Sequence, residues 1–183
     1  MTEEIIIAGF GGQGVLSMGK ILAYSGVMAS QEVSWFPSYG PEMRGGTANV
    51  TVILSDSRIS SPVLNEYDTA IILNQQSMDK FEAHVKPGGV LIYDPNGIIH
   101  PPKRTDINIY KIEGTLIAAE LGNVKTFNMV VLGGYLKAKP IVKLESVELG
   151  LKKSLPSRHH YLIPMNLEAV QKGIENLELV QAV

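Results

Sequence analysis

A glycine-rich segment near the amino terminus limits the folds open to this chain more than any other feature. The apolar run Ile5-Ile6-Ile7-Ala8 leads directly into Gly9-Phe10-Gly11-Gly12-Gln13-Gly14, and a helix-like stretch over 15–29 follows. The spacing G-x-G-x-x-G between a strand and a helix suits a tight turn, a close approach of backbone to phosphate, and close packing of helix on strand. The pattern predicts an anion-binding loop at a helix amino terminus.

A second glycine-flanked segment, Tyr39-Gly40-Pro41-Glu42-Met43-Arg44-Gly45-Gly46, follows about thirty residues later. Its proline fixes one backbone angle and its glycines permit unusual ones. Two interpretations stay open. The segment is a recognition loop in which Arg44 binds a carboxylate or phosphate, or it is a surface turn in which Glu42 and Arg44 pair with each other. Neither interpretation supplies a nucleophile.

The apolar pattern predicts an α/β fold, a Rossmann-like doubly wound and mostly parallel sheet with one antiparallel strand pair and helices on both faces. Short apolar strands are expected near 4–8, 47–54, 69–73, 90–93 and 107–112, with 58–61 returning antiparallel after 47–54. Pro87-Gly88-Gly89 is expected as a turn before a strand, and Tyr161-Leu162-Ile163 as strand-like within an otherwise helical last third. We expect one domain over 1–183.

The site for an ordinary dinucleotide is incomplete. Binding of NAD needs an acid at the end of the second strand, where it holds the ribose. That strand ends Ser34-Trp35-Phe36-Pro37, whereas Glu32 stands at its start, and no arginine stands at the strand end for NADP. An ordinary NAD site is therefore disfavoured, and the glycines either form a loop for another anion or only make a close strand-to-helix turn.

Composition excludes several classes of function. The net charge is -2 without a long basic run, so no nucleic acid partner is expected. Cysteine is absent, which excludes thiolate ligation of iron–sulfur clusters or zinc by this chain, and no metal site is expected. The start carries Glu3 and Glu4, and no apolar run reaches the roughly 20 residues that span a bilayer. We expect a cytoplasmic protein without a membrane partner.

Candidate catalytic groups are scattered. His84, His100 and the segment Arg158-His159-His160 lack a paired acid, and Asp94 before Pro95 is expected to form a turn. Without a paired acid and base, the chain is expected to carry no catalytic residue of its own.

The order of the motifs resembles one family. The two glycine segments, then Asn128-Met129-Val130-Val131-Leu132-Gly133, then Asn166, Ala169 and Gly173 resemble the gamma subunit of 2-oxoacid:ferredoxin oxidoreductases, most of all the 2-oxoglutarate type. The resemblance runs nearly end to end. It implies a complex that converts a 2-oxoacid, coenzyme A and oxidised ferredoxin into acyl-CoA, carbon dioxide and reduced ferredoxin.

The resemblance also implies how the work is divided. Thiamine diphosphate, Mg and the iron–sulfur clusters lie in partner alpha, beta and in some complexes delta ferredoxin-like subunits, while the gamma subunit covers the active site and contacts coenzyme A. The expected contacts are Gly9, Gly11, Gly12, Gln13 and Gly14 from the first loop and Tyr39, Gly40, Glu42, Arg44 and Gly45 from the second. The isolated chain is expected to be inactive and able to form a homodimer.

Two other functions stay open at this point. A free-standing nucleotide-binding oxidoreductase is favoured by the glycine fingerprint alone. A non-catalytic subunit that only holds the complex together is compatible with the missing acid–base pair.

Overall fold

The computed structural model describes residues 1–38 and 47–183. Its strands are β1 (Thr2–Phe10), β2 (Glu32–Ser38), β3 (Thr47–Ser55), β4 (Tyr67–Ile72), β5 (Val85–Tyr93), β6 (Asn108–Lys111) and β7 (Glu178–Gln181). Its α-helices are α1 (Val15–Met28), α2 (Gln75–Phe81), α3 (Gly114–Glu120), α4 (Phe127–Ala138), α5 (Leu144–Ser154) and α6 (Ile163–Asn176). The 3-10 turns η2 (Glu82–His84), η3 (Pro95–Gly97), η4 (Val124–Thr126) and η5 (Ser157–Leu162) lie among the connections.

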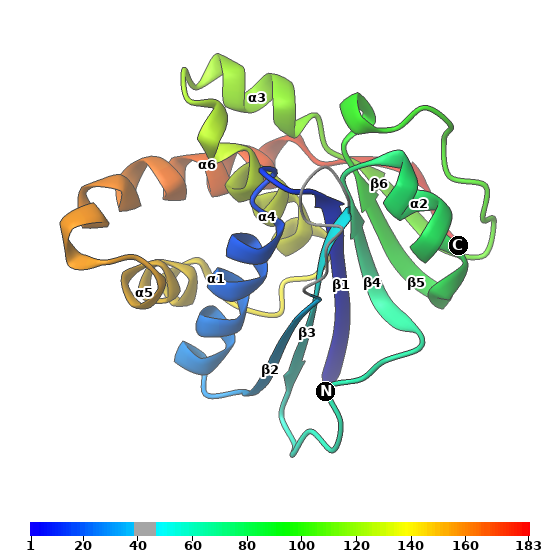
Figure 1. Ribbon diagram of the computed structural model, residues 1–183, viewed down its shortest axis with the longest axis horizontal. Coiled ribbons are helices and arrows are strands. Elements are labelled where there is room, and N and C mark those ends of the chain that lie inside the picture. The colour runs from blue at the N-terminus through cyan, green and yellow to red at the C-terminus, as the bar shows by residue number, and fades with distance from the viewer. Residues whose placement is uncertain (39–46) are drawn as a thin grey trace.

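The strands of the described residues form one sheet in the order β2-β3-β1-β4-β5-β6-β7 (Figure 1). The neighbours β1 and β4, β4 and β5, and β5 and β6 pair in parallel. Strand β3 is antiparallel to both β1 and β2, and β7 is antiparallel to β6. Strand β2 therefore runs in the direction of β1, so that five of the seven described strands point one way and β3 and β7 point the other. The predicted α/β fold class is confirmed, with three antiparallel pairings where the sequence predicted one.

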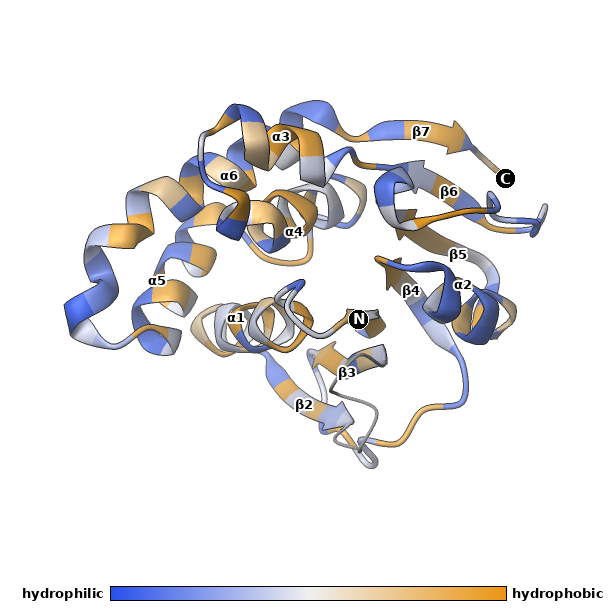
Figure 2. Ribbon diagram, turned by 45° about the horizontal axis from the view of Figure 1, so that its top comes forward, coloured by the Kyte–Doolittle hydropathy of each residue, from blue (hydrophilic) through white to orange (hydrophobic). Residues whose placement is uncertain are grey.

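The sheet separates two hydrophobic cores. Ile5 and Ile7 of β1 face the larger core with α1, α4, α5 and α6, whereas Ile6 and Ala8 face the smaller core with α2. Because successive strand residues point to opposite faces, an unbroken apolar run is required for a strand covered on both sides. In Figure 2, α1, α4, α5 and α6 lie together on one side of the sheet and α2 lies on the other.

Strand β3 explains one wrong expectation. Residues 58–61 form no strand, and the antiparallel partners of β3 are β1 and β2. Since β3 is paired with β1 over its whole length and with β2 over 49–55, it has no free edge beside 58–61 to offer a returning strand. Pro37 lies inside β2 instead of ending it, which an edge strand tolerates because its outer side needs no amide donor.

Two further expectations were wrong. Pro87, Gly88 and Gly89 lie within β5, where the pairing with β4 shifts register, and not in a separate turn. The last third is helical only up to β7, a short edge strand, and 161–163 belongs to η5 and the start of α6. In both places the secondary structure depends on contacts with strands or helices that are distant in the sequence, and local sequence patterns do not show these contacts.

Candidate functional site

The glycine loop, residues Gly9–Gly14, joins the carboxyl end of β1 to the start of α1. Gly12 has φ 95° and Gly14 has φ 75°, and both values favour glycine over residues with a side chain. Gly14 is the N-cap of α1, so no side chain caps this helix and its first turn carries no acidic residue. Within residues 1–38 and 47–183, no side chain accepts a hydrogen bond from the first amides of α1, so these amides are available to an external anion.

Gln13 fixes the shape of the loop. Its side-chain oxygen accepts a hydrogen bond from the Phe10 amide at 2.7 Å, and its side-chain nitrogen donates to the Leu73 carbonyl at 3.1 Å. A Cβ at Gly9 would lie 2.5 Å from the Gln13 oxygen, so this contact explains the first glycine. The amide of Gln13 thus braces β1 against the segment after β4, and its polar atoms already have backbone partners.

Asn128, at the start of α4, holds the loop from the other side. Its Nδ2 donates to the Gly14 carbonyl at 3.2 Å. A Cβ at Gly14 would lie 2.6 Å from the same nitrogen, so the third glycine is needed for space as well as for its backbone angle. Asn128 is 9% exposed, and within residues 1–38 and 47–183 no donor bonds its Oδ1.

A cavity of about 410 Å³ opens beside the loop; we call it the glycine-loop cavity. It is formed by the loop and α1, the start of α3, η4 and the start of α4. Its lining residues are Gly12, Gln13, Gly14, Ser17, Thr115, Ala118, Val124, Lys125, Phe127 and Asn128. Among these, Lys125 is the single charged residue. Together with the uncapped amides of α1, its ammonium group makes the cavity favourable to an anion.

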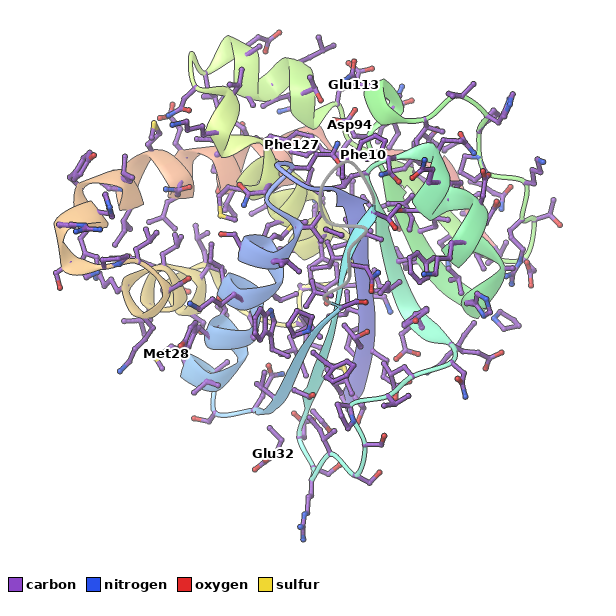
Figure 3. The ribbon with its side chains drawn as sticks, in the orientation of Figure 1. Phe10, Met28, Glu32, Asp94, Glu113 and Phe127 are labelled. Atoms are coloured by element: carbon purple, nitrogen blue, oxygen red, sulfur yellow. The ribbon has the colours of Figure 1, made fainter. Side chains whose placement is uncertain are left out.

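Asp94 positions one wall of this cavity. The carboxylate is 2% exposed and accepts bonds from the amide and the hydroxyl of Thr115, at 2.9 and 2.8 Å, and from the Asn96 amide at 2.8 Å. It therefore closes a turn, as the sequence predicted, and holds the start of α3 over the loop. Figure 3 shows Phe10, Asp94 and Phe127 gathered at one end of the sheet, with Glu32 at the opposite end.

The position of Glu32 bears on the dinucleotide interpretation. Strand β3 lies between β1 and β2. The strand that would carry a ribose-binding acid is therefore two strand spacings, roughly 10 Å, from the glycine loop instead of one. An ordinary NAD site is disfavoured by this topology as well as by the residue type.

The described lining residues of the glycine-loop cavity are suited to binding a ligand. Its described lining residues include no aspartate, glutamate, histidine or cysteine that could act as a base for Ser17 or Thr115. Within the described part of the chain, no group of three or more potential metal ligands is placed to hold a metal ion. His160 bonds the carbonyls of Lys152 and Leu155, each at 3.0 Å, and so contributes to the fold.

The structure brings together part of the predicted site. Gly12, Gln13 and Gly14 line the cavity, Gly11 is exposed beside it, and Gly9 is buried beneath Gln13. Tyr39, Gly40, Glu42, Arg44 and Gly45 lie outside the described residues. The residues on either side of that second segment are described: Thr47 of β3 pairs with Phe10 of β1, and Ser38 of β2 pairs with Asn49 of β3, two residues along from Thr47. Both flanks lie at the end of the sheet that carries the glycine loop.

Sequence reasoning missed Ser17, Thr115 and Lys125 as lining residues. Asn128 was noticed within a motif but not as a contact of the loop. Gly14 and Asn128 are separated by 114 positions, so no local pattern joins them.

Comparison with known proteins gives the class of this chain. Residues 4–176 match the profile of the family described as pyruvate ferredoxin/flavodoxin oxidoreductase. The chain belongs to this family, and the resemblance noted from its motifs is confirmed.

Individual relatives narrow the class. The chain is 35% identical over 179 residues to the 2-oxoglutarate synthase subunit KorC of Methanocaldococcus jannaschii, covering 96% of this chain and 94% of that one. It is 36% identical over 174 residues to the ketoisovalerate oxidoreductase subunit VorA of Methanothermobacter thermautotrophicus, covering 94% of this chain but 36% of that one. The chain thus spans about a third of the length of the VorA relative.

Solved structures agree with these relatives. The gamma subunit of a keto/oxoacid ferredoxin oxidoreductase from Geobacter sulfurreducens has a TM-score of 0.82 and 27% identity, covering 96% of both chains. The 2-oxoglutarate:ferredoxin oxidoreductase from Magnetococcus marinus, solved with 2-oxoglutarate, coenzyme A and succinyl-CoA bound, has a TM-score of 0.83 and 26% identity, covering 94% of this chain and 30% of that one. Among the helices described here, none is long and apolar enough to cross a membrane.

Proposed function

We propose that this chain is the gamma subunit of a 2-oxoacid:ferredoxin oxidoreductase that forms acyl-CoA, carbon dioxide and reduced ferredoxin from a 2-oxoacid, coenzyme A and oxidised ferredoxin. The observation that carries the proposal is the match to KorC over nearly the full length of both chains. Alpha and beta subunits, in some complexes with a delta ferredoxin-like subunit, are its partners. Residues 1–183 act as one gamma-type domain, which the matched range 4–176 supports.

The redox and carbanion chemistry belongs to the partners. The chain has no cysteine for a cluster, and its described residues place no carboxylate group for the Mg of thiamine diphosphate. Thiamine diphosphate, when bound by the partners, supplies the carbanion chemistry. This chain alone turns over no substrate. Separated from its partners it self-associates, since Val27 and Phe36 are 49% and 50% exposed.

The gamma subunit contributes by positioning coenzyme A. The glycine loop offers backbone amides, and Lys125 offers the cation that the phosphates of coenzyme A require. Gly11, Gly12 and Gly14 present their backbone to the ligand, while Gly9 and Gln13 hold the loop in shape. Tyr39, Gly40, Glu42, Arg44 and Gly45 complete the site from the second loop. Correct positioning lowers the entropic cost of the reaction without any reacting group from this chain.

A pair of glycine variants in the reconstituted complex tests this role. Gly12→Ala strains a positive-φ position in the loop, whereas Gly88→Ala strains a positive-φ position in β5; neither added Cβ meets an atom within 4 Å. The backbone cost of each is about 1 kcal/mol. We expect Gly12→Ala to raise the KM for coenzyme A and leave the KM for the 2-oxoacid unchanged, and Gly88→Ala to change neither.

The opposite result has a defined meaning. If Gly12→Ala leaves the KM for coenzyme A at the value of the Gly88→Ala complex, the loop is no coenzyme A contact. The chain would then be an assembly subunit only.

A further inference from the structure

Strand β2 is an edge strand of the sheet, and part of its backbone has no partner among residues 1–38 and 47–183. The Asp56 amide donates to the Met1 carbonyl at 3.0 Å, and this bond fixes the alternation along β3: even-numbered residues bond β1 and odd-numbered residues bond β2. The residues of β2 that pair with odd-numbered residues of β3 are themselves even-numbered. The amides of Val33 and Trp35 therefore point away from the sheet, and Pro37, on the same side, has no amide hydrogen to offer.

An apolar groove lies beside this free edge, between α1 and β2. It has a volume of about 270 Å³, and Lys20 is the single charged residue among its described lining residues. The other lining residues are Ala23, Tyr24, Val27, Val33 and Trp35. Val27 is 49% exposed on the α1 side, and Phe36, on the opposite face of β2, is 50% exposed. Apolar surface therefore flanks the unpaired amides on both faces of the strand.

The charge of the groove does not favour an acidic partner. The Lys20 ammonium lies 5.9 Å from the centroid of the Tyr24 ring, so a contact within the chain already balances part of its charge. The rest of the described lining is uncharged. An apolar surface with its own amide donors is the better complement to this groove and edge.

The size of the edge limits what that partner is. The outward amides lie within residues 33–35, and three strand residues span only about 10 Å. A stable interface buries about 800 Å² on each side, so a partner that pairs with this edge must also cover the outer side of α1. A second copy of this chain has both an edge strand and a helix in the required relation, because a two-fold axis brings the same surface to both sides.

We infer that two copies of this chain associate about a two-fold axis through antiparallel β2 strands, with the amides and carbonyls of Val33 and Trp35 forming the new ladder. Each α1 then covers the apolar groove of the other copy. This inference rests on the proposed self-association of the chain and gives its surface and symmetry. Pro37 ends the ladder on one side, which keeps the pairing short.

A change in the groove tests this surface in the purified full-length chain. Val27→Lys adds a second cation beside Lys20, and Leu149→Lys, at a residue 44% exposed on α5 and outside the groove, is the matched control. Sedimentation over a range of protein concentrations measures the dimer dissociation constant. We expect Val27→Lys to raise it more than about tenfold, because the added charge loses its water in the interface of both copies. The control leaves it unchanged, and the melting temperatures of both variants show that they fold.

Amide exchange of the unmodified chain tests the ladder itself. We expect the amides of Val33 and Trp35 to exchange more slowly as the protein concentration rises through the dissociation constant. The amides of Ser34 and Phe36, which face β3, should exchange slowly at every concentration. Residue-resolved exchange measured by NMR distinguishes the two sets, since they alternate along one strand.

Several results would overturn the inference. A chain that is monomeric at all concentrations excludes the dimer and the proposed self-association together. A dimer that Val27→Lys does not weaken, or one in which Val33 and Trp35 still exchange rapidly, uses another surface. If the chain is monomeric and Val27→Lys instead weakens its assembly with the alpha and beta subunits, the edge belongs to a partner subunit. None of these results changes the KM test with Gly12→Ala, so the coenzyme A role stands or fails separately.

Discussion

The two ends of strand β1 use charge in opposite ways. At its amino end, Lys86 bonds Glu4 at 2.6 Å and Asp68 at 2.7 Å, and the buried Glu3 accepts from Thr69 at 2.6 Å and from Lys139 at 3.4 Å. We call these residues the amino-end charge cluster. At the carboxyl end, α1 has no side-chain cap and Lys125 faces a cavity without a described acid. Charge at the amino end is neutralised within the fold, whereas Lys125 at the carboxyl end has no described acidic partner, as the proposed ligand site requires.

The largest expected effect concerns the carboxyl end. Gly14→Ala puts a side chain at a positive φ and against Asn128, and it should lower the free energy of unfolding by about 3 kcal/mol. Gly122→Ala has nearly the same φ with no atom within 4 Å of its Cβ, so it should cost about 1 kcal/mol. Denaturant unfolding of both variants measures the difference. Equal losses would mean that Asn128 does not restrict this position.

The next effect separates stability from binding at the amino end. Lys86→Met leaves the carboxylates of Glu4 and Asp68, both partly buried, without their cation. We expect the free energy of unfolding to fall by about 2 kcal/mol. The KM for coenzyme A in the complex should stay unchanged. A raised KM with unchanged stability would reverse the roles of the two ends.

For Lys125→Ala we expect the opposite: a raised KM for coenzyme A with nearly unchanged stability. Because Lys125 is exposed and has no described ion-pair partner, its loss should change the free energy of unfolding by less than about 0.5 kcal/mol. Loss of a charge-assisted contact to phosphate should raise the KM for coenzyme A about tenfold. Lys20→Ala is the control for a general loss of positive charge, because Lys20 is an exposed residue of α1 that does not line the glycine-loop cavity. A KM equal to that of the control would remove Lys125 from the site.

The smallest effect is the pH dependence of the amino-end charge cluster. Burial lowers the pKa of Lys86, but its hydrogen bonds to Asp68 and Glu4 raise the pKa by more than burial lowers it. The pKa of Lys86 therefore lies above its ordinary value. A raised pKa in the folded state gives stability that is present below the unfolded value of about 10.4 and is lost as pH rises through the folded value. The difference in melting temperature between the wild type and Lys86→Met should therefore narrow above this range. A constant difference would exclude the charge of Lys86 as its cause.

The parts of the molecule that were predictable are those whose causes are local. The glycine loop was found because a tight turn, a positive φ and a helix start each require a particular residue within a few positions of 9–14. Strand β1 was found because burial on both faces demands an unbroken apolar run.

The remainder depends on contacts between distant segments. Strand β3 lies between β1 and β2 because of how the strand edges pair. The apolar patterns of the three strands are compatible with β3 in this central position or at the edge of the sheet, so the sequence does not decide between the two orders. Thr115 lines the cavity because it bonds Asp94, and Lys125 lines it because of the path of the α3–α4 connection. The residues next to each in the sequence form no motif that indicates ligand binding. The cavity between α1, α4, α5 and α6 results from the packing of these four helices, so no local sequence pattern predicts it.

Hydrogen–deuterium exchange of the assembled complex, with and without coenzyme A, distinguishes the two ends of β1 in one experiment. We expect coenzyme A to slow exchange at the amides of 11–17 and 124–128 and to leave 3–5 and 67–69 unchanged. Slower exchange at both ends, or at neither, would contradict a ligand site confined to the glycine-loop end.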